Sequence, residues 1–133
     1  MKTVLANGCF DGLHIGHLIH LKAAKEMGQK LIVSITNDES VKREKGWGRP
    51  LFNQEERAEF VKQLRFVDEV IIVSGVREAI QLVKPTILVK GPDYNRQSID
   101  DDTMHLCNFQ GIDIKFTEGP KFSSTALLSQ LYK

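Results

Sequence analysis

The chain contains few cysteines and no long apolar segment. Its two cysteines, Cys9 and Cys107, lie far apart, so they form neither a disulfide framework nor a pair of zinc ligands. No apolar run reaches the roughly 18 residues that a transmembrane helix requires. The N-terminus also lacks the basic and then apolar pattern of a signal peptide. We therefore expect a cytoplasmic protein with no membrane partner.

An excess of charge of one sign is missing as well. The 18 lysines and arginines nearly balance the 17 aspartates and glutamates, which leaves a net charge of +1. Such a chain has no broad basic field that would attract nucleic acid or an anionic membrane. There is no internal repeat and no low-complexity linker. The length therefore predicts a single domain over residues 1–133.

Short β-rich runs alternate with helical patterns along the chain. We expect strands at Thr3–Ala6, Leu31–Thr36, Glu69–Val73, Ile87–Lys90 and Ile112–Phe116. We expect helices at Ile15–Met27, Gln54–Leu64, Val76–Val83, Asp100–Phe109 and Ser124–Leu131. Strands separated by helices form βαβ units with right-handed crossovers. The prediction is an α/β fold, a Rossmann-like doubly wound domain with a five-stranded parallel sheet and helices on both faces.

Four segments follow predicted strands and hold the distinctive motifs of the chain. In a parallel sheet they open at the same edge, where ligands bind near a topological switch point. The sequence therefore predicts one crevice at the carboxyl ends of the strands. The segments are Asn7–His17, Asn37–Asn53, Lys90–Ser98 and Gly119–Thr125.

The first of these segments is the most informative. A strand runs into a glycine-containing turn, and His14 and His17 then lie three residues apart where a helix begins. Free backbone N–H groups and the helix dipole make such a turn an anion site. Two imidazoles added there suggest a nucleoside triphosphate held for chemistry on a phosphate. Metal ligation and a purely structural role are the alternatives, although no cysteine or third histidine is placed to complete a zinc site.

The run Gly8-Cys-Phe-Asp-Gly-Leu-His-Ile-Gly-His17 resembles the Gly-x-Phe-Asp-x-x-His-x-Gly-His signature of the cytidylyltransferase-like nucleotidyltransferases. Within this family, the chain is most similar to the adenylyltransferases that activate heptose 1-phosphate in lipopolysaccharide precursor synthesis. The resemblance implies that an acceptor phosphate attacks the α-phosphorus of a nucleoside triphosphate and that pyrophosphate leaves. Further similar segments, in the family's order, are Thr36–Gly46, Arg49-Pro50, Glu56-Arg57, Leu88–Tyr94 and Ser123–Thr125.

The resemblance also implies roles for individual residues. The catalytic donors to phosphate are His14, His17 and Lys45. The residues expected to bind the nucleotide are Gly8, Cys9, Phe10, Asp11, Gly16, Lys42, Lys90, Gly91, Asp93, Ser123, Ser124 and Thr125. Arg49, Arg57 and Tyr94 are expected to bind the substrate. No protein ligand is assigned to a metal, because Mg²⁺ or another divalent cation is expected to be carried by triphosphate oxygens and water.

Several of these residues have a second interpretation. For Asp11, a role in shaping its own turn is favoured over direct contact with phosphate or metal. Phe10 is expected to pack beneath the nucleotide. For His20, which lies one turn further along the helix, a surface or packing role is favoured. Trp47 suits either a lid over the substrate or a partner interface. Arg57 is either part of a surface ion pair or, by the family pattern, a residue at the rim of the active site.

The substrate is less well defined than the reaction. ATP with a sugar 1-phosphate, and heptose 1-phosphate in particular, is favoured. CTP with a polyol or amino-alcohol phosphate such as glycerol 3-phosphate is the alternative, but Glu118 stands where glycerol-phosphate cytidylyltransferases have arginine. Phe122 replaces the cysteine of the heptose adenylyltransferases. A non-catalytic nucleotide-binding module is a third reading. Family members are commonly dimers, so a homodimer is compatible with the resemblance.

Overall fold

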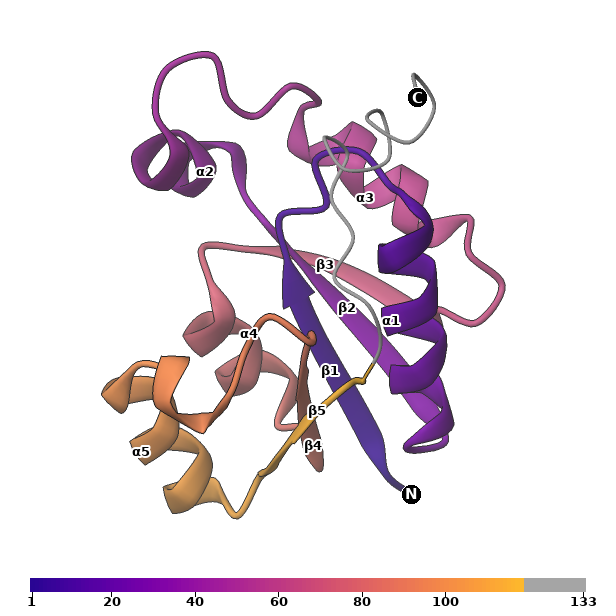
Figure 1. Cartoon of the computed structure of the whole chain (residues 1–133), viewed down its shortest axis with the longest axis vertical. Coiled ribbons are helices and arrows are strands. Elements are labelled where there is room, and N and C mark those ends of the chain that lie inside the picture. Colours follow the sequence, from indigo (N-terminus) through magenta and orange to yellow (C-terminus); the bar gives the residue numbers. More distant parts are fainter. Residues whose placement is uncertain (119–133) are drawn as a thin grey trace, which may run out of the picture.

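The computed structural model describes residues 1–118, and these form a parallel sheet with helices on both sides (Figure 1). The strands are β1 (Thr3–Gly8), β2 (Lys30–Thr36), β3 (Glu69–Val73), β4 (Ile87–Lys90) and β5 (Asp113–Phe116). The helices are α1 (Ile15–Glu26), α2 (Asp38–Lys45), α3 (Gln54–Lys62), α4 (Val76–Val83), α5 (Asp101–Gln110) and the short 3₁₀ helix η1 (Arg96–Ser98).

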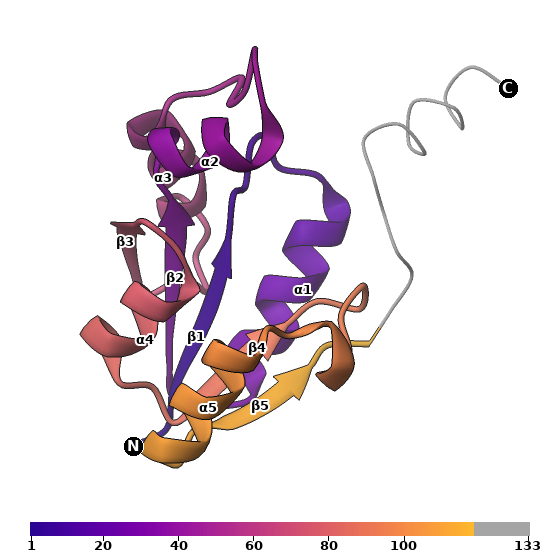
Figure 2. The ribbon, with the colours of Figure 1, turned by 90° about the vertical axis from the view of Figure 1, so that its left-hand side faces the viewer.

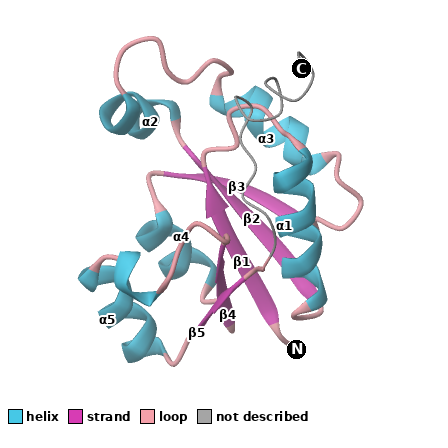
Figure 3. Ribbon diagram, viewed as in Figure 1, coloured by secondary structure: helices cyan, strands magenta, loops and turns pink. Residues whose placement is uncertain are grey.

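All neighbouring strands pair in parallel, in the order β3-β2-β1-β4-β5 (Figure 3). The chain therefore builds the sheet outward from β1 through β2 to β3 and then returns to place β4 on the other side of β1. A ligand crevice is expected at this reversal, beyond the carboxyl ends of β1 and β4. The predicted doubly wound α/β fold is confirmed.

Two apolar clusters hold the layers together. Leu21 and Ala24 of α1 and Val61 of α3 pack with Val33 of β2 against one face. The other cluster places Ile80 of α4 and other apolar side chains of α4 and α5 against the opposite face. Figure 2 shows α4 and α5 in front of the sheet and α1 behind it. Burial on both faces explains why the central strands are almost continuously apolar.

Polar caps fix where several helices begin. The side chains of Asn37, Asn53 and Asp100 accept backbone N–H groups at the first turns of α2, α3 and α5. The sequence predicts the helix that follows Asn53, whereas it predicts no helix in the segment Asn37–Asn53. That expectation is wrong, because α2 occupies half of it.

The remaining predicted elements agree with the structure to within a few residues. The last predicted helix, Ser124–Leu131, lies outside the described residues. No helix within residues 1–118 has the combined length and apolar character to cross a bilayer.

Candidate active site

The carboxyl ends of β1 and β2 bring the histidine turn next to the start of α2. Gly8 at the end of β1 pairs with Ile35 of β2. The Asn7 amide donates to the Ser34 hydroxyl over 2.7 Å and thereby joins the two strands just below the turn. The first and second predicted site segments therefore leave the sheet side by side, as the topology requires.

His14 and His17 together cap the N-terminus of α1. Nδ1 of His14 accepts the backbone N–H of Gly16 over 3.1 Å, and Nδ1 of His17 accepts the backbone N–H of His14 over 3.2 Å. The two rings lie 3.9 Å apart between centroids, at 32°. This is a capping box in which imidazoles replace the usual hydroxyl and carboxylate groups. The pair satisfies free N–H groups of the helix and is fixed in orientation by them.

The same hydrogen bonds decide which nitrogen carries the proton. A neutral imidazole has one acceptor and one donor nitrogen, and in both rings Nδ1 is occupied as an acceptor. Each neutral ring therefore presents an Nε2–H donor. Burial, assisted by the charges of His14, His20 and Lys45, lowers the pKa of His17 from 6.5 to about 4. His17 is thus a neutral donor at physiological pH.

Phe10 and Gly8 support the turn from below. Phe10 is only 6% exposed and belongs to the apolar core, and its ring centroid lies 5.3 Å from that of His17. A Cβ atom on Gly8 would lie 2.7 Å from Phe10 Cε2, so only glycine leaves room for the ring. Phe10 packs in the core next to His17, whereas its expected place beneath the nucleotide remains a prediction.

Asp11 joins the histidine turn to the segment before α3. Its carboxylate accepts the N–H groups of Leu51 and Phe52 over 2.8 and 2.9 Å, and Nε of Arg49 over 3.1 Å. Burial raises the pKa of Asp11, but these hydrogen bonds together outweigh it and hold the pKa below its usual value. Asp11 thus fixes the turn through the segment before α3 rather than through its own backbone, and its contact with nucleotide remains a prediction. Its side chain is 3% exposed, which leaves little room for a metal ion.

Arg57 does not lie at the rim of the site. Its side chain is fully buried, and its guanidinium donates to the carbonyl oxygens of Cys9, Thr36 and Phe52 over 2.7–2.9 Å. It also pairs with Asp38 over 2.8 Å. Both the expected contact with substrate and the surface ion pair are wrong. Arg57 instead fastens the histidine turn to the start of α2, an effect of tertiary packing that the helix pattern does not show.

The cationic residues of the second segment lie on α2 and the loop after it. Lys45 ends the helix, and its charge makes a small contribution to the lowered pKa of His17. Lys42, Arg49 and Trp47 line a hollow of about 580 Å³ in this loop. The Trp47 indole is fully exposed. The catalytic role of Lys45 and the binding roles of Lys42 and Arg49 remain predictions.

The segment after β4 places a further cation near the crevice. Nζ of Lys90 lies 5.0 Å from the ring centroid of Tyr94, and burial lowers the pKa of Lys90 against the opposing effect of Asp100. Burial and then the Lys90 charge lower the pKa of His20, and His20 Nδ1 lies 2.7 Å from the Thr117 hydroxyl. This contact, which joins α1 to the end of β5, supports the packing role expected for His20.

Other predicted site residues stay untested. Gly91 and Asp93 follow β4 at the expected edge, whereas Ser123, Ser124 and Thr125 lie outside the described residues. Within residues 1–118, no group of three or more histidine, cysteine or acidic side chains is arranged to hold a metal ion.

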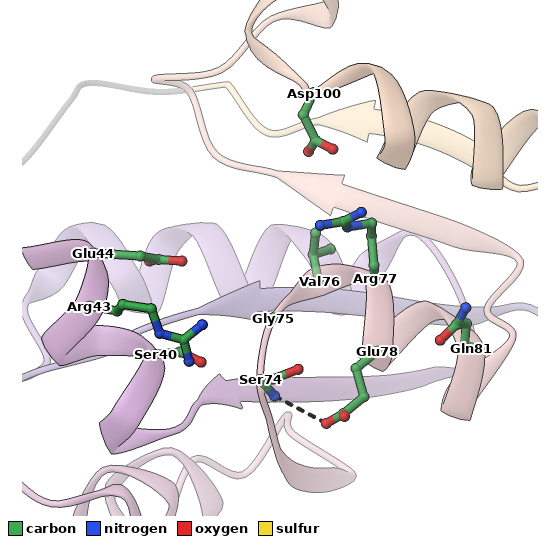
Figure 4. A pocket seen from close by; sticks show the side chains of 10 residues that line it. All are labelled: Ser40, Arg43, Glu44, Ser74, Gly75, Val76, Arg77, Glu78, Gln81 and Asp100. Atoms are coloured by element: carbon green, nitrogen blue, oxygen red, sulfur yellow. Dashed lines mark hydrogen bonds between the residues drawn. The ribbon is translucent and has the colours of Figure 1, made fainter.

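Sequence reasoning missed one feature at this edge. A polar hollow of about 650 Å³ lies between α2 and the N-terminal part of α4 (Figure 4). It includes Ser40, Arg43, Arg77, Glu78 and Asp100. These residues come from three separate segments with no shared motif, so only the tertiary structure brings them together.

Comparison with known proteins agrees with this geometry. The sequence model described as cytidylyltransferase-like matches residues 5–128. The chain is 47% identical to the bifunctional protein HldE of Nitratiruptor sp. over 98% of its own length, and 38% identical to that of Helicobacter pylori over the same share. It spans only 28% and 27% of those two proteins.

Solved structures show the same fold. The lipopolysaccharide core biosynthesis protein from Thermoplasma volcanium is 28% identical, with a TM-score of 0.75 over 92% of this chain and 99% of that one. Pantothenate synthetase from Thermus thermophilus shares the fold at 16% identity, with a TM-score of 0.62 over 94% of this chain and 58% of that one.

Proposed function

Because this chain belongs to the cytidylyltransferase-like family of nucleotidyltransferases, we propose that it joins the adenylyl group of ATP to a sugar 1-phosphate and releases pyrophosphate. The observation that carries the proposal is the capping pair of His14 and His17, which presents two Nε2–H donors at a helix N-terminus. The family signature, read from the sequence, assigns these two imidazoles to the reacting phosphates.

The reaction needs no general base. A phosphomonoester has its second pKa near 6, so the acceptor oxygen is already anionic at neutral pH. That oxygen forms a bond to the α-phosphorus while the bond from the α-phosphorus to the bridging oxygen of the β-phosphate breaks. His14 and His17 donate to the oxygens on which charge develops, and Lys45 offsets the charge of the departing pyrophosphate. Such fixed donors act by positioning and electrostatic stabilisation.

A divalent cation fits this site through the nucleotide rather than through the protein. The carboxylate of Asp11, the acidic residue of the turn, already accepts hydrogen bonds from Arg49, Leu51 and Phe52. Mg²⁺ commonly keeps several waters and binds phosphate oxygens. A bound ion would neutralise triphosphate charge, while His14, His17 and Lys45 would donate to the phosphate oxygens.

The acceptor we favour is heptose 1-phosphate. The sequence resemblance indicates this branch, and the relatives named HldE cover the whole length of the described fold. The 28% identical structure is a lipopolysaccharide core biosynthesis protein, which supports a role for the product in lipopolysaccharide precursor synthesis. The family's own name, cytidylyltransferase-like, is the observation that favours CTP and a polyol phosphate as the second candidate.

Pyrophosphate release tests these alternatives directly. The purified chain is assayed with each of four nucleoside triphosphates against heptose 1-phosphate, mannose 1-phosphate and glycerol 3-phosphate. We expect release with ATP only when a sugar 1-phosphate is present. A preference for CTP with glycerol 3-phosphate would replace the first candidate by the second. Nucleotide binding without release under any condition would leave only the non-catalytic module.

A further inference from the structure

The polar hollow between α2 and α4 has no role in the mechanism derived above. We call it the α2–α4 hollow. It opens on the face of the sheet that α4 and α5 cover, at the carboxyl edge (Figure 4). Its volume of about 650 Å³ falls in the range of small-molecule sites. Its main polar side chains are those of Ser40, Arg43, Glu44, Ser74, Arg77 and Glu78.

The hollow is a neighbour of the catalytic turn. Arg43 and Glu44 of α2 line it, and the next residue along the same helix is Lys45, whose charge reaches His17. Asp100 closes the hollow from the α5 side, and its charge in turn acts on Lys90 at the end of β4. The hollow therefore adjoins the helix that ends at Lys45 and lies at the same carboxyl edge of the sheet as the histidine turn. An acceptor held there lies at the edge of the sheet where the nucleotide is expected.

The lining suits a phosphorylated sugar better than a nucleobase. Among the described residues that line the hollow, Val76 is the only large apolar one and none is aromatic, whereas a planar base is usually held by apolar or aromatic surfaces. Guanidinium groups recognise phosphate through paired donors. Carboxylates accept hydrogen bonds from hydroxyl groups. The hollow offers both kinds of group on facing walls.

Two of these acceptors are already fixed in place. Glu78 accepts the backbone N–H of Ser74 over 3.0 Å, and Asp100 accepts the N–H and hydroxyl of Thr103 over 3.0 and 2.7 Å. Each carboxylate keeps further lone pairs for a ligand. Figure 4 shows the Asp100 carboxylate directed toward the Arg77 side chain. This arrangement presents a cation and hydroxyl acceptors in fixed positions.

The cations, by contrast, are held weakly. Arg77 pairs with Asp102 over 3.1 Å, but both side chains are mostly exposed, so the pair is worth little. Arg43 lies on the exposed face of α2. Both guanidinium groups are therefore available to exchange a weak partner or water for a dianionic phosphate.

We propose that the α2–α4 hollow binds the phosphorylated sugar acceptor, with Arg43 and Arg77 on its phosphate and Glu78 and Asp100 on its hydroxyl groups. The proposal rests on the proposed function for its reaction but names residues that the family signature does not include. It makes the hollow the specificity pocket and leaves the histidine turn to the nucleotide.

The test uses Arg43→Gln, Arg77→Gln and the double variant, with Arg65→Gln as the control, because Arg65 is an exposed arginine after α3 and away from the hollow. Titration calorimetry with heptose 1-phosphate and mannose 1-phosphate, without nucleotide, measures acceptor binding. Pyrophosphate release measures the KM for each substrate. Loss of a charged hydrogen bond should weaken acceptor binding about 10-fold or more in each single variant, while the KM for ATP stays within about twofold.

The outcomes separate the two proposals. If the wild type is active and the double variant keeps its acceptor affinity and KM, the hollow is not the acceptor site although the proposed function stands. An equal rise in both KM values would also overturn the assignment. The wild type could release no pyrophosphate with any acceptor and yet bind a sugar phosphate that Arg77→Gln fails to bind. In that case the proposed reaction is refuted, and the assignment of the hollow as a sugar phosphate site is supported. Absence of sugar phosphate binding by the wild type would refute the hollow itself.

Discussion

Replacing Arg57 by methionine is the sharpest test of how the site is held together. The guanidinium donates to the carbonyl oxygens of Cys9, Thr36 and Phe52 and pairs with Asp38. These contacts tie the histidine turn, the end of β2, the start of α2 and the loop before α3 to one side chain. Methionine fills much of the volume but supplies no donor, so the acceptors lose their partner.

The carbonyl groups decide the size of the effect. Asp38 is 31% exposed, so water takes over part of the lost ion pair and that contribution stays near or below about 1 kcal/mol. A buried acceptor left without a donor costs about 1–3 kcal/mol, and three are affected here. Breaking a buried charged network of this kind typically costs about 3–5 kcal/mol. That is a large share of the roughly 5–15 kcal/mol by which domains are stable.

Urea denaturation followed by circular dichroism measures the change, with Arg65→Met as the exposed arginine control. We expect the control to stay within about 0.5 kcal/mol of wild type and Asp38→Asn to lose far less than Arg57→Met. Arg57→Lys keeps the charge but not the fork of donors, so it should recover only part of the loss. A loss below about 1 kcal/mol in Arg57→Met would refute the reasoning, because the carbonyl groups would then have found other partners.

Three further predictions concern the histidine turn. His17→Ala should lower kcat by about 10²–10³-fold with little change in nucleotide affinity. His105 is exposed, so His105→Ala should change neither quantity. A loss of nucleotide affinity without a loss of kcat would contradict the donor role of His17. Because the folded state holds the pKa of His17 at about 4 instead of 6.5, the unfolded chain binds the proton first. Stability should therefore fall as the pH drops from 6.5 to about 4. His17→Ala should flatten that slope in urea titrations, apart from the share of His20, whose pKa is also lowered; an unchanged slope would count against a buried neutral His17. Gly8→Ala would place Cβ 2.7 Å from the Phe10 ring and should destabilise the fold by about 1–3 kcal/mol in the same denaturation assay, whereas a neutral change would mean that the ring moves freely.

The strands could be predicted because they depend on local patterns. The run from Leu31 to Thr36 is apolar and β-branched enough to identify a central strand. α2 was missed because it is short and strongly charged, and its only apolar side chain is Val41. The signal was present nonetheless, since Asn37 caps it with Asp38 and Glu39 in the first turn and three basic residues in the last. A similar pattern, an asparagine cap with two glutamates in the first turn, stands at the start of α3, which was predicted.

Arg57 and the α2–α4 hollow could not be predicted for a different reason. Both depend on residues that are far apart in the sequence and close in space. An arginine on a charged helix face is normally exposed, and only the convergence of three carbonyl groups buries this one. The hollow likewise requires α2 and α4, which are separated along the chain by α3 and β3, to lie at the same edge of the sheet.

The two roles of His14 can be separated, and this gives a last prediction. Its Nδ1 caps α1, while its Nε2–H is the proposed phosphate donor, so the proposal assigns stability and catalysis to different atoms of one side chain. Asparagine is a good N-cap residue but carries no donor at the position of Nε2. His14→Asn should therefore keep nearly wild-type stability and lose activity, whereas His14→Ala should lose activity and also about 1 kcal/mol of stability. Parallel denaturation and pyrophosphate assays compare the variants. Wild-type activity in His14→Asn would show that the histidine is there to cap the helix and that the donors come from elsewhere.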